Sequence, residues 1–473
     1  MQQYRTKIGG SSVETREVQL IHSPFDGAAV AEVSIAGEHE ADRAIASSLD
    51  GFAALRRAST HERAELLDRI ASGIRERATE FAELITKESG KPIRYARGEV
   101  TRAITTFTLA AAEARTLKGE LLPIDQAPGL EGRLCLYKRV PRGPILGISP
   151  FNFPLNLVAH KLAPALAVGC SLLLKPPAQA PLTAHLLSDV VDAAGAPNGA
   201  FNVLHCKPEL GERLVLDPRL RVLSFTGSDA LGWRLKGLVP RKQVVLELGG
   251  NAPCLIDADI DFRAALPKLL ESAWASAGQV CIKAQRFFVH TRIFDEFLQA
   301  FVAESERVVV GDPLDERTVV GPLIETRHVE RVLEWVREAG EGGARVLCGN
   351  RAERQLVWPT VVTDTSPGMR VCDMEIFGPV TVVERAESLE HAVELANATR
   401  FGLQASLFTR DIGAALRAYE QLDYGGVLVN DPTTFRVDNY PYGGTKESGF
   451  GREGVRFAME EFSEPKLLSL RAL

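Results

Sequence analysis

Three polar residues stand where their side chains could carry out nucleophilic chemistry on a carbonyl group. Cys281 follows an expected helix in ASAGQVCIKAQR, and a thiolate is a strong nucleophile whose reactivity rises near helix termini and hydrogen-bond donors. Glu247 emerges between two leucines in VVLELGGN, where apolar surroundings would raise the pKa of its carboxyl group and suit it to act as a base. Asn152 follows an expected strand in ISPFNFPLN, and its carboxamide could donate to a developing oxyanion.

Each of these residues also has a purely structural interpretation. Glu247 could be a paired structural charge, and Asn152 could be a turn former. A lone cysteine is most often a small buried residue. The other six cysteines occur singly, without a CxxC pair or a zinc-type spacing, as Cys135, Cys170, Cys206, Cys254, Cys348 and Cys372. We therefore predict no metal site and no disulfide framework, a pattern typical of a reducing compartment.

A further set of residues could hold a phosphate-containing cofactor. The stretch VLSFTGSDALGW predicts a strand and then Thr226, Gly227 and Ser228 at the start of a helix, and the free N–H groups of a helix N-terminus bind phosphate. This is not the GxGxxG fingerprint, and a simply capped helix start is the alternative. Lys175, at the end of SLLLK, could reach a phosphate or a ribose, or could be a solvated strand end.

A parallel sheet would bring these residues together, and the sequence predicts one. Short apolar runs at 144–149, 171–176, 201–205, 222–227 and 244–250 alternate with two helical stretches, LNLVAHKLAPALAVG and PLTAHLLSDVVDAAG, which we expect to be amphipathic. Such alternation indicates parallel strands covered by helices. Ligands bind these sheets beyond the carboxyl ends of the strands, where Asn152, Lys175, Ser228 and Glu247 would lie.

The rest of the chain divides into three kinds of pattern. An Ala-rich helical section runs from Glu38 to about Arg115, and a second strand–helix alternation from about Ala252 to Leu428 predicts a second α/β domain. LEGRLCLYKRVPRG and the final FSEPKLLSLRAL alternate as strands do. They could pair into a protruding element or form two ordinary edge strands, and both possibilities stay open.

The composition excludes several classes of protein. The 473 residues are 45% hydrophobic and 25% charged, as in a globular protein. With 55 Lys+Arg against 61 Asp+Glu and a net charge of −6, no basic run predicts a nucleic acid or an anionic membrane as partner. The N-terminus lacks the apolar core of a signal peptide, and no apolar stretch approaches the ~20 residues of a membrane span. We predict a cytoplasmic protein.

Seven segments, in this order along the chain, resemble the aldehyde dehydrogenase superfamily: PFNFP, KPP, FTGS, LELGGN, GQVC, EIFGP and PYGGTKESGFGREG. The resemblance implies CoA-independent oxidation of an aldehyde to a carboxylic acid with NAD or NADP. It also implies an α/β fold with two doubly wound parallel-sheet domains, a Rossmann-like cofactor domain and a catalytic domain, plus a small β oligomerisation element. Residues 1–115 and 144–247 would form the first, 248–430 the second, and 116–143 with 454–473 the element that builds a homodimer or homotetramer.

The resemblance further implies roles for individual residues. Cys281 would attack the aldehyde to give a thiohemiacetal, whose oxyanion Asn152 and the Cys281 N–H would hold, and Glu247 would activate the water that hydrolyses the thioester. The implied cofactor-binding residues are Ile148, Ser149, Pro150, Lys175, Pro177, Ala178, Gly211, Phe225, Gly227, Ser228, Leu248, Gly249, Glu375 and Phe377.

Two departures from the family pattern bear on the site. Ala178 stands where NAD-preferring members commonly carry a glutamate, so no carboxylate there repels a 2′-phosphate, and use of both cofactors is favoured. Lys283, two residues after the nucleophile, stands where similar proteins usually have a small or neutral residue. We expect it to point to solvent, and the alternative is that it lowers the pKa of Cys281.

The substrate is the least constrained inference. NDPTTFRVDNYPYGG resembles the subgroup that acts on lactaldehyde and other small functionalised aldehydes, and Arg436 there is a candidate for binding an anionic group. A surface ion pair is the alternative. Members that bind a phosphate often carry Arg directly before the nucleophile, and Val280 in that position argues against an anionic substrate. Phe153 and His160 are further candidates for substrate contact, with a structural histidine as the alternative for His160.

Two other functions compete with the expected one. A CoA-acylating dehydrogenase would pass the thioester to CoA, but relatives of that kind tend to lack the general-base glutamate that is present here as Glu247. A catalytically silent structural protein could keep the same fold, but loss of Cys281, Glu247 or Asn152 would be its mark, and all three are present.

Overall fold

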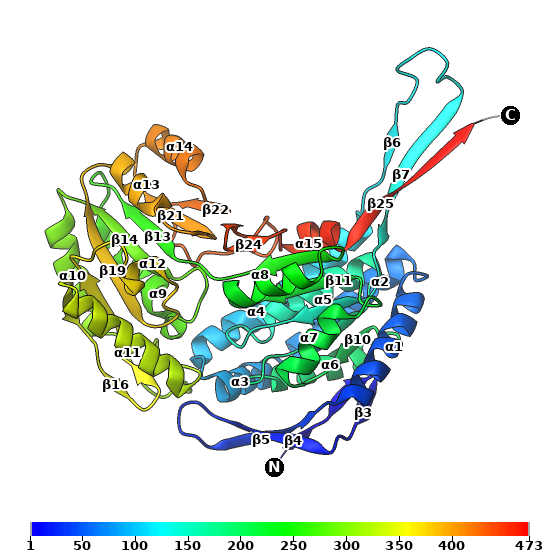
Figure 1. Ribbon diagram of the computed structural model, residues 1–473, viewed down its shortest axis with the longest axis horizontal. Helices are drawn as coiled ribbons and strands as arrows, with labels where there is room; N and C mark the ends of the chain where they lie inside the picture. The colour runs from blue at the N-terminus through cyan, green and yellow to red at the C-terminus, as the bar shows by residue number, and fades with distance from the viewer. Residues whose placement is uncertain (1, 472–473) are drawn as a thin grey trace.

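Two α/β units and a thin β arm make up the computed structural model, which describes residues 2–471 (Figure 1). Each unit is built around one large sheet, of eight strands in the first and seven in the second. Along residues 2–471, no helix combines the length and the apolar character that crossing a membrane requires.

The first sheet contains all five strands that the sequence predicted in this region. Its order is β24-β12-β11-β8-β9-β10-β2-β3, and the five central strands run parallel. These are β8 (Ile145–Ile148), β9 (Leu172–Lys175), β10 (Phe201–Val203), β11 (Val222–Thr226) and β12 (Gln243–Glu247). The edges are antiparallel additions, β2 (Thr6–Ile8) with β3 (Ser11–Val13) on one side and β24 (Gly449–Phe450) on the other.

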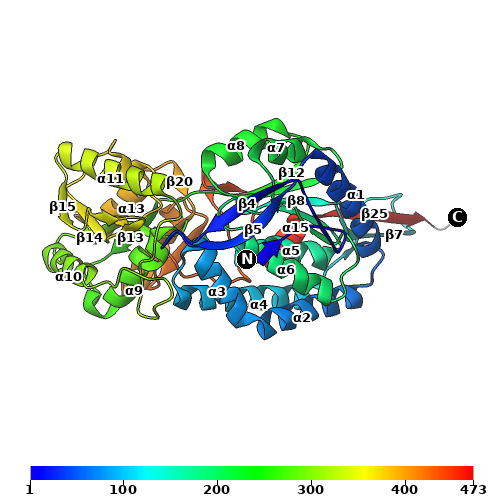
Figure 2. The ribbon, with the colours of Figure 1, turned by 90° about the horizontal axis from the view of Figure 1, so that it is seen from below.

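Helices cover both faces of this sheet (Figure 2). One face carries α5 (Asn156–Val168) and α6 (Leu182–Ala193), backed by α2 (Thr60–Glu76), α3 (Ala78–Ser89) and α4 (Ile93–Arg115). The other carries α1 (Glu38–Leu55), α7 (Pro208–Leu216) and α8 (Asp229–Leu238). The helical front section that the sequence predicted therefore supplies one helix to one face and three to the other.

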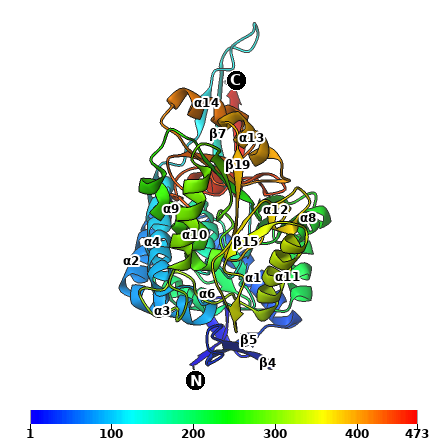
Figure 3. The same cartoon turned by 90° about the vertical axis from the view of Figure 1, so that its left-hand side faces the viewer.

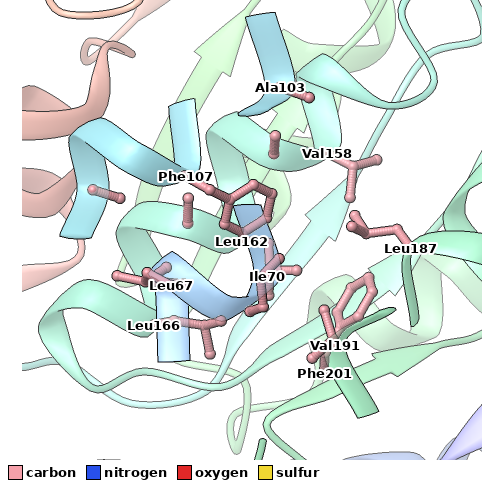
Figure 4. Packing of buried hydrophobic residues seen from close by; sticks show 14 of the residues in the cluster. Leu67, Ile70, Ala103, Phe107, Val158, Leu162, Leu166, Leu187, Val191 and Phe201 are labelled. Atoms are coloured by element: carbon pink, nitrogen blue, oxygen red, sulfur yellow. The ribbon is translucent and has the colours of Figure 1, made fainter. Parts of the chain in front are cut away.

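The core between α2, α4, α5 and α6 corrects one prediction. We expected α5 to be amphipathic, and that prediction is wrong because all of its residues are buried. The helix lies between the strands β8 and β9 and the helices α2, α4 and α15 (Val455–Glu461), so no face reaches solvent. Figure 4 shows the apolar packing around it, with Leu67, Ile70, Ala103, Phe107, Val158, Leu162, Leu166, Leu187, Val191 and Phe201.

The second sheet follows the order β15-β18-β19-β14-β13-β21-β22, parallel except for the edge strand β15. Its strands are β15 (Arg345–Cys348), β18 (Thr360–Thr363), β19 (Val380–Ala386), β14 (Ala284–His290), β13 (Ala252–Ile256), β21 (Gln404–Phe408) and β22 (Gly426–Val429). One face packs on α9 (Phe262–Trp274), α10 (Phe294–Glu306) and α11 (Thr326–Glu341), and the other on α13 (Leu389–Asn397) and α14 (Ile412–Gln421) (Figure 3).

Short elements complete the second unit. A single turn η1 (Ala275–Gly278) follows α9, and the short helix α12 (Arg370–Asp373) precedes β19. Two-residue strands pair as β16 (Ala352–Glu353) with β17 (Leu356–Val357) and as β20 (Phe401–Gly402) with β23 (Thr445–Lys446). Because β23 pairs in the second unit and β24 pairs with β12 in the first, the segment 445–450 joins the two units.

The arm resolves the alternative that the sequence left open. β7 (Arg133–Pro141) pairs antiparallel with β25 (Ser463–Arg471) over their full lengths, and β6 (Glu120–Leu122) adds a third strand. The three strands project from the first unit (Figure 1). Within the predicted range 454–473, however, α15 packs on α4 and α5, so 463–471 is the part that joins the arm.

The sequence missed the strands before α1. β1 (Gln2–Tyr4), β5 (Ala29–Ile35) and β4 (Glu17–His22) form a separate three-stranded sheet that crosses the lower side of the first unit (Figure 1). In β4 only Ile21 is buried, and so little apolar burial leaves the strand without the alternation that would reveal it.

Candidate active site

A cavity of about 400 Å³ brings Cys281, Glu247 and Asn152 together. Its first wall lies beyond the carboxyl ends of β8, β11 and β12, from which Asn152, Ser228 and Glu247 are presented. The second unit contributes the opposite wall, including Cys281 from the loop between η1 and β14. The rule that placed ligands beyond the strand ends therefore located one side of the cavity correctly.

The loop that carries Cys281 has an unusual backbone. Ser276, Ala277 and Gly278 are three consecutive residues with positive φ, at 53°, 57° and 67°. Left-handed conformations cost energy in residues with a side chain, and they persist where the surrounding structure holds them. On its other side, a side chain at Gly250 would collide with the carbonyl oxygen of Cys281, so the loop packs directly on the chain that follows β12.

The Cys281 thiol is partly buried beside a hydroxyl. Its Sγ atom lies 3.2 Å from the Tyr442 hydroxyl oxygen, and burial raises the pKa of Cys281 to about 11. The thiol is therefore protonated at neutral pH, and forming the nucleophilic thiolate requires a base to take the proton or a donor to stabilise the anion.

Glu247 is a buried carboxyl group without a hydrogen-bond partner on either oxygen anywhere in residues 2–471. Burial, and then the nearby charge of Glu453, raise the pKa of Glu247 well above its ordinary value, while Arg436 and Lys161 oppose the shift. Glu453 itself is paired, with Lys161 at 3.3 Å and Arg436 at 3.2 Å. A carboxyl group with a raised pKa and free oxygens can accept a proton from water.

Asn152 ties the two units together at the cavity. Its Nδ2 atom donates to the carbonyl oxygen of Gln279, 2.9 Å away in the Cys281 loop, whereas its buried Oδ1 has no partner in the described chain. A carboxamide nitrogen has two N–H groups. One is used for the Gln279 carbonyl, and the other is left to donate to an oxygen atom in the cavity.

A second cavity, of about 360 Å³, is lined in part by residues of α7 and α8. Four of the predicted cofactor residues line it: Ile148, Lys175, Gly211 and Phe225. The side chain of Ser228 makes no capping hydrogen bond to α8 in the described structure, so the first N–H groups of this helix are free to meet a phosphate.

Most of the remaining predicted cofactor residues line the catalytic cavity: Pro150, Gly227, Ser228, Leu248, Gly249, Glu375 and Phe377. Glu375 is partly buried and accepts the Gly250 N–H at 3.0 Å. Desolvation raises its pKa to about 7, although this hydrogen bond opposes the shift. A carboxyl group held in this way suits the hydroxyl groups of a ribose. Among the described residues, Ser149, Pro177 and Ala178 line neither cavity, and the Ala178 carbonyl accepts from Gln19 of β4 at 3.1 Å.

Known proteins identify this arrangement. Residues 11–468 match the sequence family described as "Aldehyde dehydrogenase family". The chain is 38% identical over 472 residues to the 3-sulfolactaldehyde dehydrogenase of Priestia aryabhattai, covering 99% of this chain and 98% of that protein. This chain belongs to the aldehyde dehydrogenase family. It is accordingly an NAD(P)-dependent enzyme that oxidises an aldehyde to a carboxylic acid, as the sequence predicted.

Solved structures of other aldehyde dehydrogenases confirm the fold class. Aldehyde dehydrogenase 21 from Physcomitrella patens, in complex with the reaction product succinate, is similar with a TM-score of 0.97 and 37% identity, over 99% of this chain and 98% of that one. The glyceraldehyde-3-phosphate dehydrogenase GapN from Methanocaldococcus jannaschii, complexed with NADP, is similar with a TM-score of 0.93 and 35% identity, over 97% and 100%.

Arg436 does not form the surface ion pair that was the alternative, because its ion pair with Glu453 is buried. The Arg436 side chain is only 6% exposed, lines the cavity and stacks 3.5 Å above the ring of Tyr442. The structure does not bring Phe153 or His160 to the lining of the described cavity. His160 is buried against Asp438, 2.8 Å away, which supports the structural alternative, and Phe153 lies beneath the Lys91 Nζ.

Lys283 corrects a second prediction. It does not point to solvent, because its side chain is buried and its Nζ donates to the carbonyl oxygen of Val380. Burial lowers the pKa of Lys283 to about 7. Several lining residues were not predicted from the sequence: Leu157, His328, Arg331, Tyr442 and Glu453. Tyr442 and Glu453 lie within the quoted late motif, which offered a signal, whereas His328 and Arg331 belong to α11, an ordinary amphipathic helix by its pattern.

Proposed function

We propose that Cys281, Asn152 and Glu247 carry out the reaction of this aldehyde dehydrogenase. The observation that supports the proposal is that one cavity holds a thiol, an amide N–H and a carboxyl group without a partner. Cys281 releases its proton to solvent water and forms a bond from Sγ to the aldehyde carbon, and Asn152 donates to the resulting oxyanion. NAD or NADP, when bound, supplies the acceptor for the hydride that leaves this carbon.

The second half of the reaction returns the enzyme to its starting state. Loss of the hydride leaves a thioester on Cys281. Glu247 takes a proton from water, the hydroxide oxygen bonds to the thioester carbon, and Asn152 again donates to the oxyanion. The C–S bond then breaks and the carboxylic acid leaves, and the proton that Glu247 took from water passes to the Cys281 thiolate, which restores the thiol and the free Glu247 base. The residues proposed to hold the cofactor are Lys175, Gly211 and Phe225 around adenosine, Gly227 and Ser228 at the pyrophosphate, and Glu375 at the nicotinamide ribose.

Replacement of Cys281 tests this assignment. Cys281→Ala should abolish aldehyde oxidation while the affinity for NAD or NADP, measured by titration, stays within about twofold, because the thiol is needed for bond formation and not for cofactor binding. Retained turnover would refute the mechanism.

Glu247→Gln should accumulate the thioester, visible as a burst of NADH without steady turnover. A requirement for added CoA in the wild type would favour the acylating alternative.

The proposed substrate is a small aldehyde that carries an anionic or hydroxyl group. Arg436 supports it, because its guanidinium lines the cavity and its Nε has no partner in residues 2–471. The similar proteins include one named for sulfolactaldehyde and one crystallised with succinate, both anions. Val280 argues the other way, since no arginine precedes the nucleophile. A panel of neutral, hydroxylated, carboxylated and sulfonated aldehydes with both cofactors tests this proposal.

We further propose a cytoplasmic homodimer or homotetramer assembled through the arm. Leucines on the arm are exposed, among them Leu121 at 64% and Leu467 at 61%, and clustered exposed apolar side chains mark interaction surfaces. Seven free cysteines suit a reducing compartment. Residues 1–115 with 144–247 would act as the cofactor domain and 248–430 as the catalytic domain. A smaller mass in analytical ultracentrifugation after Leu467→Asp would support the interface.

A further inference from the structure

A buried carboxylate holds the turn that carries Asn152. Glu99 of α4 reaches the first N–H groups of α5, and its Oε1 accepts from Leu155 at 2.8 Å and from Asn156 at 3.1 Å. Its side chain is fully buried. A carboxylate that accepts two N–H groups at a helix N-terminus fixes both the direction of the helix and the chain just before it.

Lys91 completes this arrangement. Its Nζ forms an ion pair with the other oxygen of Glu99, and its side chain is 3% exposed. The same Nζ lies 3.6 Å from the ring centroid of Phe153, the residue directly after Asn152, close enough for a cation–π attraction. The turn 152–156 is therefore held by Lys91 at its aromatic ring and by Glu99 at its last two N–H groups. Thr106 of α4 adds a hydrogen bond to the side chain of Asn156 at 3.2 Å.

Neither Glu99 nor Lys91 belongs to the set of described residues that line the catalytic cavity. Both contact residues 153–156 without lining the cavity, so they reach the chemistry only through the segment that holds Asn152. We infer that Glu99 and Lys91 are positioning residues for oxyanion stabilisation, an inference that rests on the role proposed for Asn152.

The physical reason is the geometry that oxyanion stabilisation demands. A donor contributes to the rate only when it points at the position of the oxyanion, and a misplacement of about 1 Å can cost about 10²-fold in rate. In Glu99→Gln the amide has one acceptor and one donor group. It cannot both accept the two N–H groups and face the Lys91 ammonium, so either the helix start or the cation loses its partner.

The chain offers a matched control. Glu88 of α3 is likewise fully buried and accepts the Leu182 and Thr183 N–H groups, at 2.7 Å and 3.0 Å, at the start of α6. Glu88→Gln therefore removes a carboxylate from the same kind of helix start in a place that does not carry Asn152.

The test is a double-mutant cycle read by the single-turnover rate of NADH formation, with KM values and melting curves for each variant. Asn152→Ala should slow this rate by about 10²-fold or more, as loss of an oxyanion donor does. Glu99→Gln should slow it about tenfold with KM changed less than twofold. Glu88→Gln should lower the melting temperature without slowing the rate. In the Asn152→Ala background, Glu99→Gln should not slow the single-turnover rate further, because the amide that Glu99 positions is absent there.

Two results would overturn the inference, and only the first of them would also overturn the role proposed for Asn152. A full single-turnover rate in Asn152→Ala would refute the role of Asn152 and with it this inference. A slow Asn152→Ala whose rate falls tenfold again on adding Glu99→Gln would leave the proposed function intact and refute positioning. If Glu99→Gln lacks a cooperative melting transition, Thr106→Val replaces it. Its expected loss of about threefold must then also vanish in the Asn152→Ala background.

Discussion

The hydroxyl oxygen of Tyr442 lies 3.2 Å from the Sγ atom of Cys281, with both side chains inside the catalytic cavity. Since burial raises the pKa of Cys281 to about 11, a donated hydrogen bond from this hydroxyl is the nearest available stabilisation for a thiolate. Tyr442→Phe removes that donor and keeps the ring beneath Arg436. Iodoacetamide should therefore alkylate Cys281 several-fold more slowly in the variant at pH 7–8, and its alkylation profile should move to higher pH. Identical profiles would mean that the hydroxyl does not act on the thiol.

Glu247 makes deacylation depend on pH. Burial and the charge of Glu453 raise its pKa, so the carboxyl group is protonated, and inactive as a base, below that raised value. The rate of thioester hydrolysis should increase as the pH rises through the pKa of Glu247 and then level off. In Glu247→Gln the hydrolysis rate should be lower by about 10²-fold or more, and this rise should be absent. Rapid-quench measurement of the acyl-enzyme at a series of pH values gives both rates, and the same rise in the variant would assign the titration to another group.

Lys175 should distinguish the two cofactors. It lines the second cavity, where we propose that adenosine binds, together with Glu209, whereas the other carboxylate there, Glu212, is paired with Arg234 at 2.6 Å. A 2′-phosphate would gain a cation from Lys175. Lys175→Met should therefore reduce kcat/KM for NADP about tenfold more than for NAD. Lys207→Met is the control, because this exposed lysine pairs with Glu17 at 2.7 Å and lines neither cavity in the described structure. An equal reduction of kcat/KM for both cofactors would show that Lys175 does not contact the 2′-phosphate.

Arg436 should contribute to substrate affinity according to the charge of the aldehyde. Its guanidinium faces the cavity while it pairs with Glu453 at 3.2 Å. Because charge-assisted hydrogen bonds are stronger than neutral ones, Arg436→Met should raise KM about tenfold or more for a carboxylated or sulfonated aldehyde. For a neutral aldehyde of equal length, KM should rise less. Any effect of disturbing Glu453 changes both KM values alike, so it cancels in the ratio of the two KM changes. A ratio of one would favour a purely structural ion pair.

Residues placed by sheet topology could be predicted from the sequence. Glu247, Ser228 and Lys175 stand at ends of parallel strands, and that position alone put them at the ligand-binding edge. Local apolar runs sufficed because each strand is buried on both faces. The partner strands of the arm are separated by some 300 residues, so their pairing left no local signal, and only the folded chain decides between pairing and two free edges.

The burial and hydrogen-bond partners of individual side chains could not be predicted from the sequence. Lys283 looks like a surface lysine in the sequence, yet it is buried because Gly278 leaves space beside its side chain and the Val380 carbonyl offers an acceptor. His160 looks equally suited to a substrate pocket, but Asp438 holds it in the core. The hydrogen-bond partners Val380 and Asp438 lie 97 and 278 residues away along the chain, and the spacing of residues in the sequence does not reveal them.

The buried Lys283 leads to a prediction about stability. Burial lowers its pKa from 10.5 to about 7, so the folded protein disfavours the charged form. Above pH 10.5 the lysine is neutral in both states and carries no penalty. As the pH falls towards 7, the unfolded chain gains the proton first, and stability declines until the folded state is protonated as well.

Lys283→Met removes this penalty of several kcal/mol and loses one hydrogen bond, worth about 1 kcal/mol. The variant should therefore melt several degrees higher than the wild type at pH 7, and the gap should close as the pH approaches 10. The control Lys268→Met, at an exposed lysine paired with Asp431 at 3.0 Å, should show no such pH dependence. A Lys283→Met variant that melts below the wild type at pH 7 would show that the bond to Val380 outweighs the cost of burying the charge.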